Sequence, residues 1–294
     1  MTQNDIPFCA GPDPAPRAPR FEMPANACDT HFHIFPANSD HMLTPRRSYT
    51  PPEASLAMYN HLAQTLGTTR GVLVQPSVYA EDNSALVAAV SAEPDRFRGV
   101  VTVTNAVTDH ELAEFHDAGI RGVRVNIVDS GGMPFSDLDA AWAFTSRIAG
   151  MGWHIELLAH VEQMDDIDTA LSKSHVPVIF GHLGYTKTSK GLDDPGFQRF
   201  LGALREGRCW VKLTGTYRIT GAEKPPYGDV VPMAQALLDA NPDRMVWGSD
   251  WPHPRHTGFM PNDGDLLNQL ADWGADAALR RRILVTNPER FYGF

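Results

Sequence analysis

The alternation of strand-like and helix-like segments constrains the fold of this 294-residue chain more than any other feature. Short runs rich in Val, Ile and Leu recur, and a segment with helical spacing of its apolar residues follows each run. The eight expected strands are Ala27–His33, Gly71–Pro76, Gly99–Val103, Gly122–Ile127, His154–Leu158, Val176–Gly181, Trp210–Thr214 and Met245–Ser249. The eight expected helices are Ser55–Leu66, Ser84–Glu93, Asp109–Ala118, Asp137–Met151, Val161–Ser172, Pro195–Glu206, Val230–Ala240 and Asp263–Leu284. This pattern predicts an α/β fold.

The number of these units favours a closed barrel. Several strand-like runs are continuously apolar, which is typical of strands buried on both faces of a parallel sheet. Eight units joined by right-handed crossovers, in about 265 residues, fit a single-domain (β/α)8 TIM barrel. The alternative is a doubly wound open sheet. Such a sheet usually has a glycine-rich phosphate-binding turn after its first strand, and residues 30–35 contain no glycine.

The N-terminal segment differs in composition from the rest of the chain. Prolines recur there and apolar periodicity is weak, so we expect an extended arm over residues 1–24. This arm is expected to wrap around the barrel domain of residues 25–294 or to stay mobile. Two later segments, residues 35–52 and the Pro- and Gly-rich Thr220–Asp229, are expected to cover the site as loops.

Composition argues against several classes of function. The formal net charge is −10 and no long basic run occurs, so we expect no nucleic-acid partner. No apolar stretch approaches the roughly 20 residues of a membrane span, and no signal-peptide pattern is visible, so we expect a cytoplasmic protein without membrane contact. The three scattered cysteines, Cys9, Cys28 and Cys209, are typical of a reducing compartment. We expect Cys28 to be a small buried residue.

Two short polar motifs stand at the ends of the first and last expected strands. They are Asp29-Thr30-His31-Phe32-His33 and Gly248-Ser249-Asp250-Trp251-Pro252-His253-Pro254. Because side chains alternate along a strand, Asp29, His31 and His33 are expected to share the inward face, where barrel active sites form. Closure of the barrel is expected to bring Asp250 opposite His31 and His33. A carboxylate among imidazoles predicts a general base for water.

Further polar side chains follow other expected strands. His182 ends the sixth strand between two glycines. Arg124 interrupts the apolar fourth strand, where its charge needs a ligand anion or an internal carboxylate. Arg218 follows the seventh strand, and two arginines on the rim that holds the His/Asp cluster favour a carboxylate-bearing substrate. Ser77 follows the second strand, where it can donate a hydrogen bond to a ligand or close a turn.

With these motifs the chain resembles the amidohydrolase superfamily, in particular its subgroup of 2-pyrone-4,6-dicarboxylate lactonase-like enzymes. The resemblance covers nearly all of residues 25–292. Besides the two motifs above, it rests on Val74-Gln75-Pro76-Ser77 with Asp82-Asn83, Gly122-Val123-Arg124-Val125-Asn126, Gly181-His182-Leu183-Gly184, Trp247 and Val285-Thr286-Asn287-Pro288. It implies an enzyme that opens a lactone ring by adding water to the ester carbonyl.

The resemblance also implies roles for individual residues. Asp250 is expected to take a proton from water, while three histidines polarise the carbonyl and stabilise the oxyanion. These catalytic positions are Asp250, His31, His33 and His182. Positions expected to bind the substrate are Arg124 and Arg218, which hold a carboxylate, together with Tyr49, Ser77 and His253, the last also supporting Asp250.

Three positions depart from the pattern of the dicarboxylate enzyme. Its arginine after the fourth strand is replaced by Asp129-Ser130-Gly131, and its arginine after the sixth-strand histidine is replaced by Tyr185. Its fifth-strand tyrosine aligns with Leu158. Because fewer anion anchors remain, we expect a lactone with one carboxylate, or a related muconolactone or sugar-acid lactone, rather than the pyrone dicarboxylate.

The metal content is a separate expectation. Binuclear relatives use a bridging carboxylate or carbamylated lysine from the fourth strand, where this chain has Arg124, whose charge disfavours an adjacent cation. We therefore expect a metal-free site without cofactor. The alternative is one Zn²⁺ on His31, His33 and Asp250, with His160 as a further ligand.

Alternative functions on the same scaffold stay open. They are a metal-dependent decarboxylase of an aromatic or muconate-type acid, a lactone isomerase, and a small-acid-binding protein without activity. The sequence contains no self-complementary patch from which to infer an oligomeric state.

Overall fold

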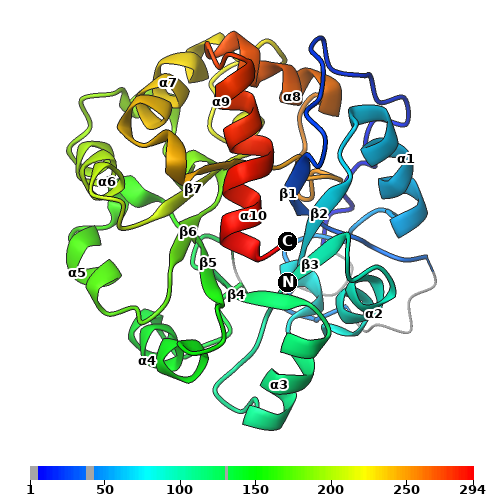
Figure 1. Cartoon of the computed structure of the whole chain (residues 1–294), viewed down its shortest axis with the longest axis vertical. Helices are drawn as coiled ribbons and strands as arrows, with labels where there is room; N and C mark the ends of the chain where they lie inside the picture. The colour runs from blue at the N-terminus through cyan, green and yellow to red at the C-terminus, as the bar shows by residue number, and fades with distance from the viewer. Residues whose placement is uncertain (1–5, 38–42, 130–131) are drawn as a thin grey trace.

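The computed structural model describes residues 6–37, 43–129 and 132–294. Eight parallel strands pair with one another in chain order, and helices surround them (Figure 1). The strands are β1 (Cys28–Phe32), β2 (Arg70–Val74), β3 (Phe97–Val101), β4 (Ile120–Asn126), β5 (His154–Leu158), β6 (Val178–Phe180), β7 (Trp210–Leu213) and β8 (Met245–Trp247). Each expected strand is present, and its ends differ little from those expected.

Residues of the two polar motifs close the barrel between β1 and β8. Phe32 forms a parallel bridge with Trp251, and the main-chain nitrogen of His33 donates to the Trp251 carbonyl at 2.8 Å. The nitrogen of Asp250 donates to the His31 carbonyl, also at 2.8 Å. A side chain at Gly248 would lie 2.7 Å from Cβ of His31, so this close approach requires glycine. The (β/α)8 barrel is confirmed.

Most of the helices form the outer layer of the barrel, and the last helix of the chain lies across one end of it (Figure 1). They are α1 (Leu56–Leu66), α2 (Ser84–Ala92), α3 (Asp109–Asp117), α4 (Leu138–Ile148), α5 (Ile167–Ser172), α6 (Pro195–Arg205), α7 (Val231–Ala240), α8 (Asp263–Asp272), α9 (Ala277–Arg281) and α10 (Asn287–Tyr292). Their ends follow local capping rules: Thr108 and Glu111 form a capping box on α3, and Asp137 caps α4. No helix in the described ranges is long and apolar enough to span a membrane.

Two of the expected helices are wrong in extent. The expected helix Asp263–Leu284 is broken after α8, where Gly274 has a φ of +90° that a regular helix cannot contain. The expected helix Val161–Ser172 divides into a 3-10 turn, η3 (Val161–Gln163), and α5. The division arises because Met164 has extended backbone and Asp166 caps a new helix start.

Both ends of the chain pack against the barrel. Phe291 and Tyr292 on α10 pack with buried apolar residues of the strands, including Cys28, which is fully buried as expected. In the N-terminal segment Phe8 forms a bridge with Thr50, and residues 13–20 lie along α8. There the backbone nitrogens of Arg17 and Arg20 donate to side chains of Asn262 and Asn268 at 3.0 and 2.7 Å.

An irregularity in β1 corrects one expectation about side-chain direction. Asp29 is aligned with Gly71 of β2 and Phe32 with Leu73, so β1 carries one extra residue between them. The bulge reverses the alternation, and Asp29 leaves the face that His31 and His33 share. Its carboxylate instead accepts hydrogen bonds from Ser249, at 2.6 Å from the hydroxyl. Asp29 therefore links β1 to the β8 loop rather than lining the site.

Candidate active site

A small polar pocket opens at the carboxyl ends of the strands and contains about 330 Å³ of space free of atoms. Most predicted site residues line it, in agreement with their expected place on the barrel rim. The lining residues are His33, Tyr49, Ser77, Arg124, Asp129, Leu158, His182, Arg218, Asp250, Pro254 and Arg255. Ser130 and Gly131 lie outside the described residues.

Asp250 is the buried carboxylate at the centre of this site. Its Oδ2 accepts a short hydrogen bond from the Tyr217 hydroxyl and a 2.8 Å bond from Nε of Arg218. Its Oδ1 has no hydrogen-bond partner among the described residues. Burial alone would raise the pKa of Asp250, but the Arg218 guanidinium and the nearby His182 hold it well below its usual value. Asp250 is therefore ionised at neutral pH, with one oxygen free.

His31 and His33 direct acceptor nitrogens at this free oxygen. Nδ1 of His33 donates to the Val74 carbonyl at 2.7 Å, which leaves a lone pair on Nε2. Nδ1 of His31 lies 2.9 Å from Oε1 of Glu156, so the same tautomer is favoured. Burial lowers the pKa of His31 to about 4 and also lowers the pKa of His33. Both imidazoles are therefore neutral and present lone pairs to the site.

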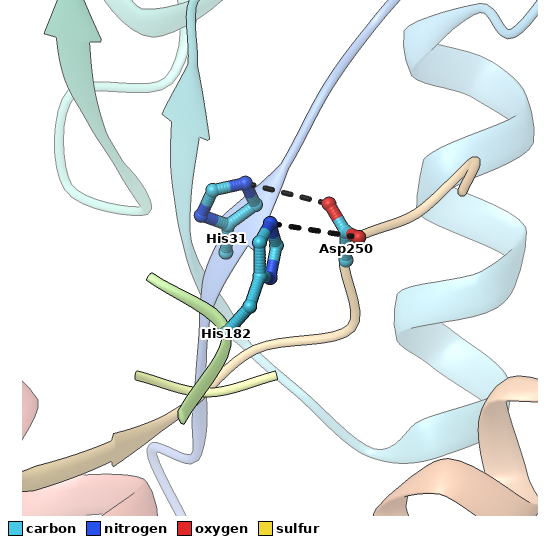
Figure 2. A group of neighbouring side chains, drawn as sticks. All are labelled: His31, His182 and Asp250. Atoms are coloured by element: carbon cyan, nitrogen blue, oxygen red, sulfur yellow. Dashed lines mark ion pairs between the residues drawn. The ribbon is translucent and has the colours of Figure 1, made fainter. Parts of the chain in front are cut away.

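His182 faces Asp250 from the end of β6 with a different environment. Figure 2 shows His182 beside His31 on one side of the carboxylate, each facing a different oxygen, with Nε2 of His182 4.0 Å from Oδ2. Nδ1 of His182 lies 2.5 Å from the Thr214 hydroxyl, which can donate to it. In that tautomer Nε2 carries a hydrogen, because a neutral imidazole has one donor and one acceptor nitrogen. His182 is therefore the histidine suited to donate to an oxyanion.

The donor set fits one divalent cation. Nε2 of His31 and Nε2 of His33 are 3.3 Å apart, and they lie 3.5 and 3.7 Å from Oδ1 of Asp250. Two ligands of a tetrahedral Zn²⁺ at about 2.0–2.1 Å lie roughly 3.3–3.4 Å apart. Ligand atoms of His31, His182 and Asp250 also lie within 4.8 Å of one another. His160 is not among the residues whose ligand atoms converge here, and its Nδ1 donates to the Tyr185 carbonyl at 3.0 Å.

A buried ion pair beneath the histidines was not assigned a role from the sequence. Nζ of Lys212 on β7 lies 2.6 Å from Oε2 of Glu156 on β5, and both side chains are buried. Burial would raise the pKa of Glu156, but Lys212 and then His31 hold it well below its usual value. The carboxylate is therefore charged and faces Nδ1 of His31. A lysine and a glutamate at inward positions of apolar strands were the only sequence signal for this pair.

The three arginines of the pocket differ in what they contact. Arg218 is paired with Asp250, and Arg255 forms an ion pair with Asp129. Nη1 of Arg124 donates to the Gln75 carbonyl at 2.6 Å. In the part of the chain that the structure describes, Arg124 forms no ion pair with a carboxylate. Among the three, it is the guanidinium without an ion-pair partner in the described ranges.

His253 departs from its expected place. Its side chain is completely buried and is not among the residues that line the pocket. It lies behind Tyr217, with Nδ1 3.1 Å from the Tyr217 hydroxyl and Nε2 3.2 Å from Oδ1 of Asp263 on α8. Tyr217 and Asp263 were missed in the sequence because they contact Asp250 and His253 only through the tertiary fold.

Comparisons with known proteins agree with this architecture. A 4-sulfomuconolactone hydrolase from Hydrogenophaga intermedia is 37% identical over 292 residues, which cover 98% of this chain and 95% of that protein. A 2-pyrone-4,6-dicarboxylate hydrolase from Comamonas testosteroni is 36% identical over 285 residues, covering 94% and 93%. The crystal structure of a probable 2-pyrone-4,6-dicarboxylic acid hydrolase from Acinetobacter baumannii, 28% identical, superposes with a TM-score of 0.79 over 92% of this chain and 100% of that one.

The match to a family model extends over nearly the whole barrel. The model, described as amidohydrolase, matches residues 28–294, from the first residue of β1 to the end of the chain. The chain therefore belongs to the amidohydrolase family.

Proposed function

We propose that the protein is a lactone hydrolase that opens the ring of a carboxylate-bearing lactone by adding water to the ester carbonyl. The observation that carries the proposal is the arrangement around Asp250. An ionised carboxylate with a free Oδ1 faces a small polar pocket, beside a histidine that can donate and an arginine without a counter-ion. The two relatives described above act on lactones, as their names state.

The residues of the site can serve both steps of the hydrolysis, the attack of water and the opening of the ring. Water bonds to the ester carbon and gives a proton to Oδ1 of Asp250, while Nε2 of His182 donates to the oxyanion. When the intermediate collapses, the ring C–O bond breaks and Asp250 returns the proton to the leaving oxygen. The product is the open-chain hydroxy acid or its keto tautomer. The acceptor nitrogens of His31 and His33 orient the hydrogens of the attacking water.

Charge in the pocket supports a substrate with a single anionic group. Asp250 neutralises Arg218 and Asp129 neutralises Arg255, which leaves the charge of Arg124 uncompensated. A lactone with one carboxylate matches that charge, whereas a dicarboxylate must displace Asp129 from Arg255 or leave one anion unpaired. Tyr49 and Ser77, which line the same pocket, are proposed to flank the bound ring.

The same three acceptors also fit the zinc-containing alternative, in which a cation would take the place of the water that they orient. Three buried acceptors converge within 3.7 Å without a hydrogen between them. A divalent cation or the hydrogens of a water must satisfy such an arrangement. His31, His33 and Asp250 would hold the cation, with Glu156 and the Val74 carbonyl orienting the two imidazoles from behind. A bound cation supplies Lewis-acid activation at this position.

Outside the site, we propose that the protein works in the cytoplasm on this small molecule without nucleic-acid or membrane partners. The net charge of −10 and the three free cysteines support this proposal.

Two measurements test the function. A panel of carboxylated lactones, followed by pH indicator and by product NMR in ¹⁸O-labelled water, is expected to show ring opening with one ¹⁸O in the new carboxylate. Asp250→Asn is expected to lower kcat by at least about 10³-fold while the circular dichroism spectrum stays unchanged. Turnover without ¹⁸O uptake would instead identify an isomerase, and wild-type turnover by the variant would refute the role of Asp250.

Metal content is tested on the same protein. Full turnover in metal-free protein is the result expected from the mechanism above. About one Zn²⁺ per chain after purification without added metal, with turnover lost on treatment with chelator and regained with Zn²⁺, would support the zinc-containing alternative instead. His33→Gln, which removes one acceptor at the rim, is expected to lower activity in either case.

A further inference from the structure

A chain of buried polar groups runs behind Asp250, away from the pocket. It begins at Asp263 in the first turn of α8, passes through His253 and Tyr217, and ends at Oδ2 of Asp250. The side chains of Asp263, His253 and Asp250 are each at most 1% exposed. Because no member of the chain except Asp250 is needed to touch a substrate, its arrangement requires a separate explanation.

The position of the Tyr217 hydroxyl hydrogen follows from its contact with Asp250. The phenol oxygen and Oδ2 of Asp250 are in very close contact, and a carboxylate only accepts, so the Tyr217 hydrogen lies between them. Nδ1 of His253, 3.1 Å from the same phenol oxygen, must therefore be the donor in their contact.

The other nitrogen of His253 meets a buried carboxylate. Nε2 lies 3.2 Å from Oδ1 of Asp263, an ion-pair distance, and neither Nε2 nor either oxygen of Asp263 has a hydrogen-bond partner among the described residues. If Nε2 carried a lone pair, two acceptors would face each other in a dry interior and Asp263 would have no counter-ion. Arg218 does not supply one, since it is paired with Asp250. The amino end of the ten-residue helix α8 favours the charged form of Asp263.

We propose that His253 is an imidazolium with a hydrogen on both ring nitrogens, and that Asp263, His253 and Tyr217 are positioning residues for Asp250. Asp263 forms an ion pair with the imidazolium, and Nδ1 of the imidazolium donates to the Tyr217 oxygen. Tyr217 and Arg218 in turn donate to Oδ2 of Asp250. Both donors act on the same oxygen, so Oδ1 stays free and directed at the pocket. Asp250 and His253 also have left-handed φ angles of 63° and 61°. Such a conformation persists only where surrounding contacts enforce it.

The charge of His253 is tested by NMR of the whole protein labelled with ¹⁵N-histidine. The signal that disappears in His253→Gln identifies the residue. We expect both ring nitrogens of His253 to be protonated at pH 7.5. A ring with one unprotonated nitrogen would overturn the proposal, whichever of the two nitrogens it is. This measurement needs no substrate, so it stands or fails separately from the proposed lactonase activity.

The positioning role, which rests on the proposed function, is tested by Asp263→Asn. This variant keeps the shape and removes the charge, so His253 is expected to lose one proton. We expect kcat to fall roughly 10- to 100-fold with KM nearly unchanged, the usual effect of removing an outer partner of a site residue. The matched control is Asp265→Asn, in the same turn of α8 but exposed and paired with Arg17, which is expected to keep wild-type kcat.

A second variant separates positioning from a merely structural role. Tyr217→Phe removes the donor to Asp250 but leaves His253 and Asp263 together. We expect kcat to fall while both nitrogens of His253 stay protonated. Wild-type kcat in both Asp263→Asn and Tyr217→Phe would overturn the positioning role, as would an equal loss of kcat in Asp265→Asn.

Discussion

For the buried pair of Lys212 and Glu156 we predict that burial, rather than the distance between the charges, determines how much stability is lost when one partner is removed. Nζ and Oε2 are 2.6 Å apart, and the two side chains are 0% and 3% exposed. Lys212→Met removes the cation that pairs with Glu156 and leaves this carboxylate in the barrel interior. Removing one partner of such a pair lowers the free energy of unfolding by about 3–5 kcal/mol. This is a large share of the roughly 5–15 kcal/mol by which a typical domain is stable.

The chain contains a matched control. Nζ of Lys173 also lies 2.6 Å from a carboxylate oxygen, that of Asp139, but these side chains are 46% and 76% exposed. Solvent screens this pair, so Lys173→Met is expected to cost only about 0–1 kcal/mol. The same chemical change at the same distance is thus expected to differ several-fold in its effect.

Urea unfolding followed by circular dichroism measures both variants, together with Glu156→Gln and the double variant Lys212→Met/Glu156→Gln. Each single variant leaves one buried charge, whereas the double variant leaves none. We expect the double variant to be at least about 2 kcal/mol more stable than the sum of the two single losses implies. Additive losses, or a loss in Lys212→Met as small as in Lys173→Met, would refute the reasoning.

Three further predictions concern other buried or charged groups. Burial lowers the pKa of His154 to about 3, against about 6.5 when unfolded, so its contribution to stability is full above about pH 6.5 and is lost as pH falls. Wild type is therefore expected to lose about 2 kcal/mol more than His154→Phe between pH 7.5 and 5, and equal losses in urea unfolding would contradict this. Arg124→Gln is expected to raise KM about 10- to 100-fold for a carboxylated lactone but not for its uncharged analogue; steady-state kinetics on both decide, and equal effects would argue against anion binding. Asp129→Asn, which frees Arg255, is expected to raise the ratio of kcat/KM for a dicarboxylate over a monocarboxylate lactone about tenfold, and an unchanged ratio would count against the charge argument.

Local patterns in the sequence were sufficient for the order of the elements. Apolar runs of strand length alternate with helical spacing, and this periodicity depends only on neighbouring residues. The same reasoning placed His33, His182 and Asp250 at strand ends, where a parallel barrel brings all such ends to one rim. The helix breaks were missed because Gly274 and the cap at Asp166 interrupt segments whose apolar spacing still looks continuous.

What periodicity could not supply is the partner of each buried polar group. A single extra residue in β1 turned Asp29 away from the histidines, although strict alternation placed all three together. The tautomers of His31 and His33 depend on Glu156 and on the Val74 carbonyl, which lie on other strands.

The amino-acid sequence by itself determined the barrel, the order of its strands and the rim on which the polar residues gather. Only the tertiary structure decided that His253 lies behind Tyr217 instead of in the pocket, and that Lys212 meets Glu156, 56 residues away. The physical reason is that apolar burial follows a short repeat along the chain. Hydrogen bonds and charges in the interior depend on contacts between distant strands, which no local pattern encodes.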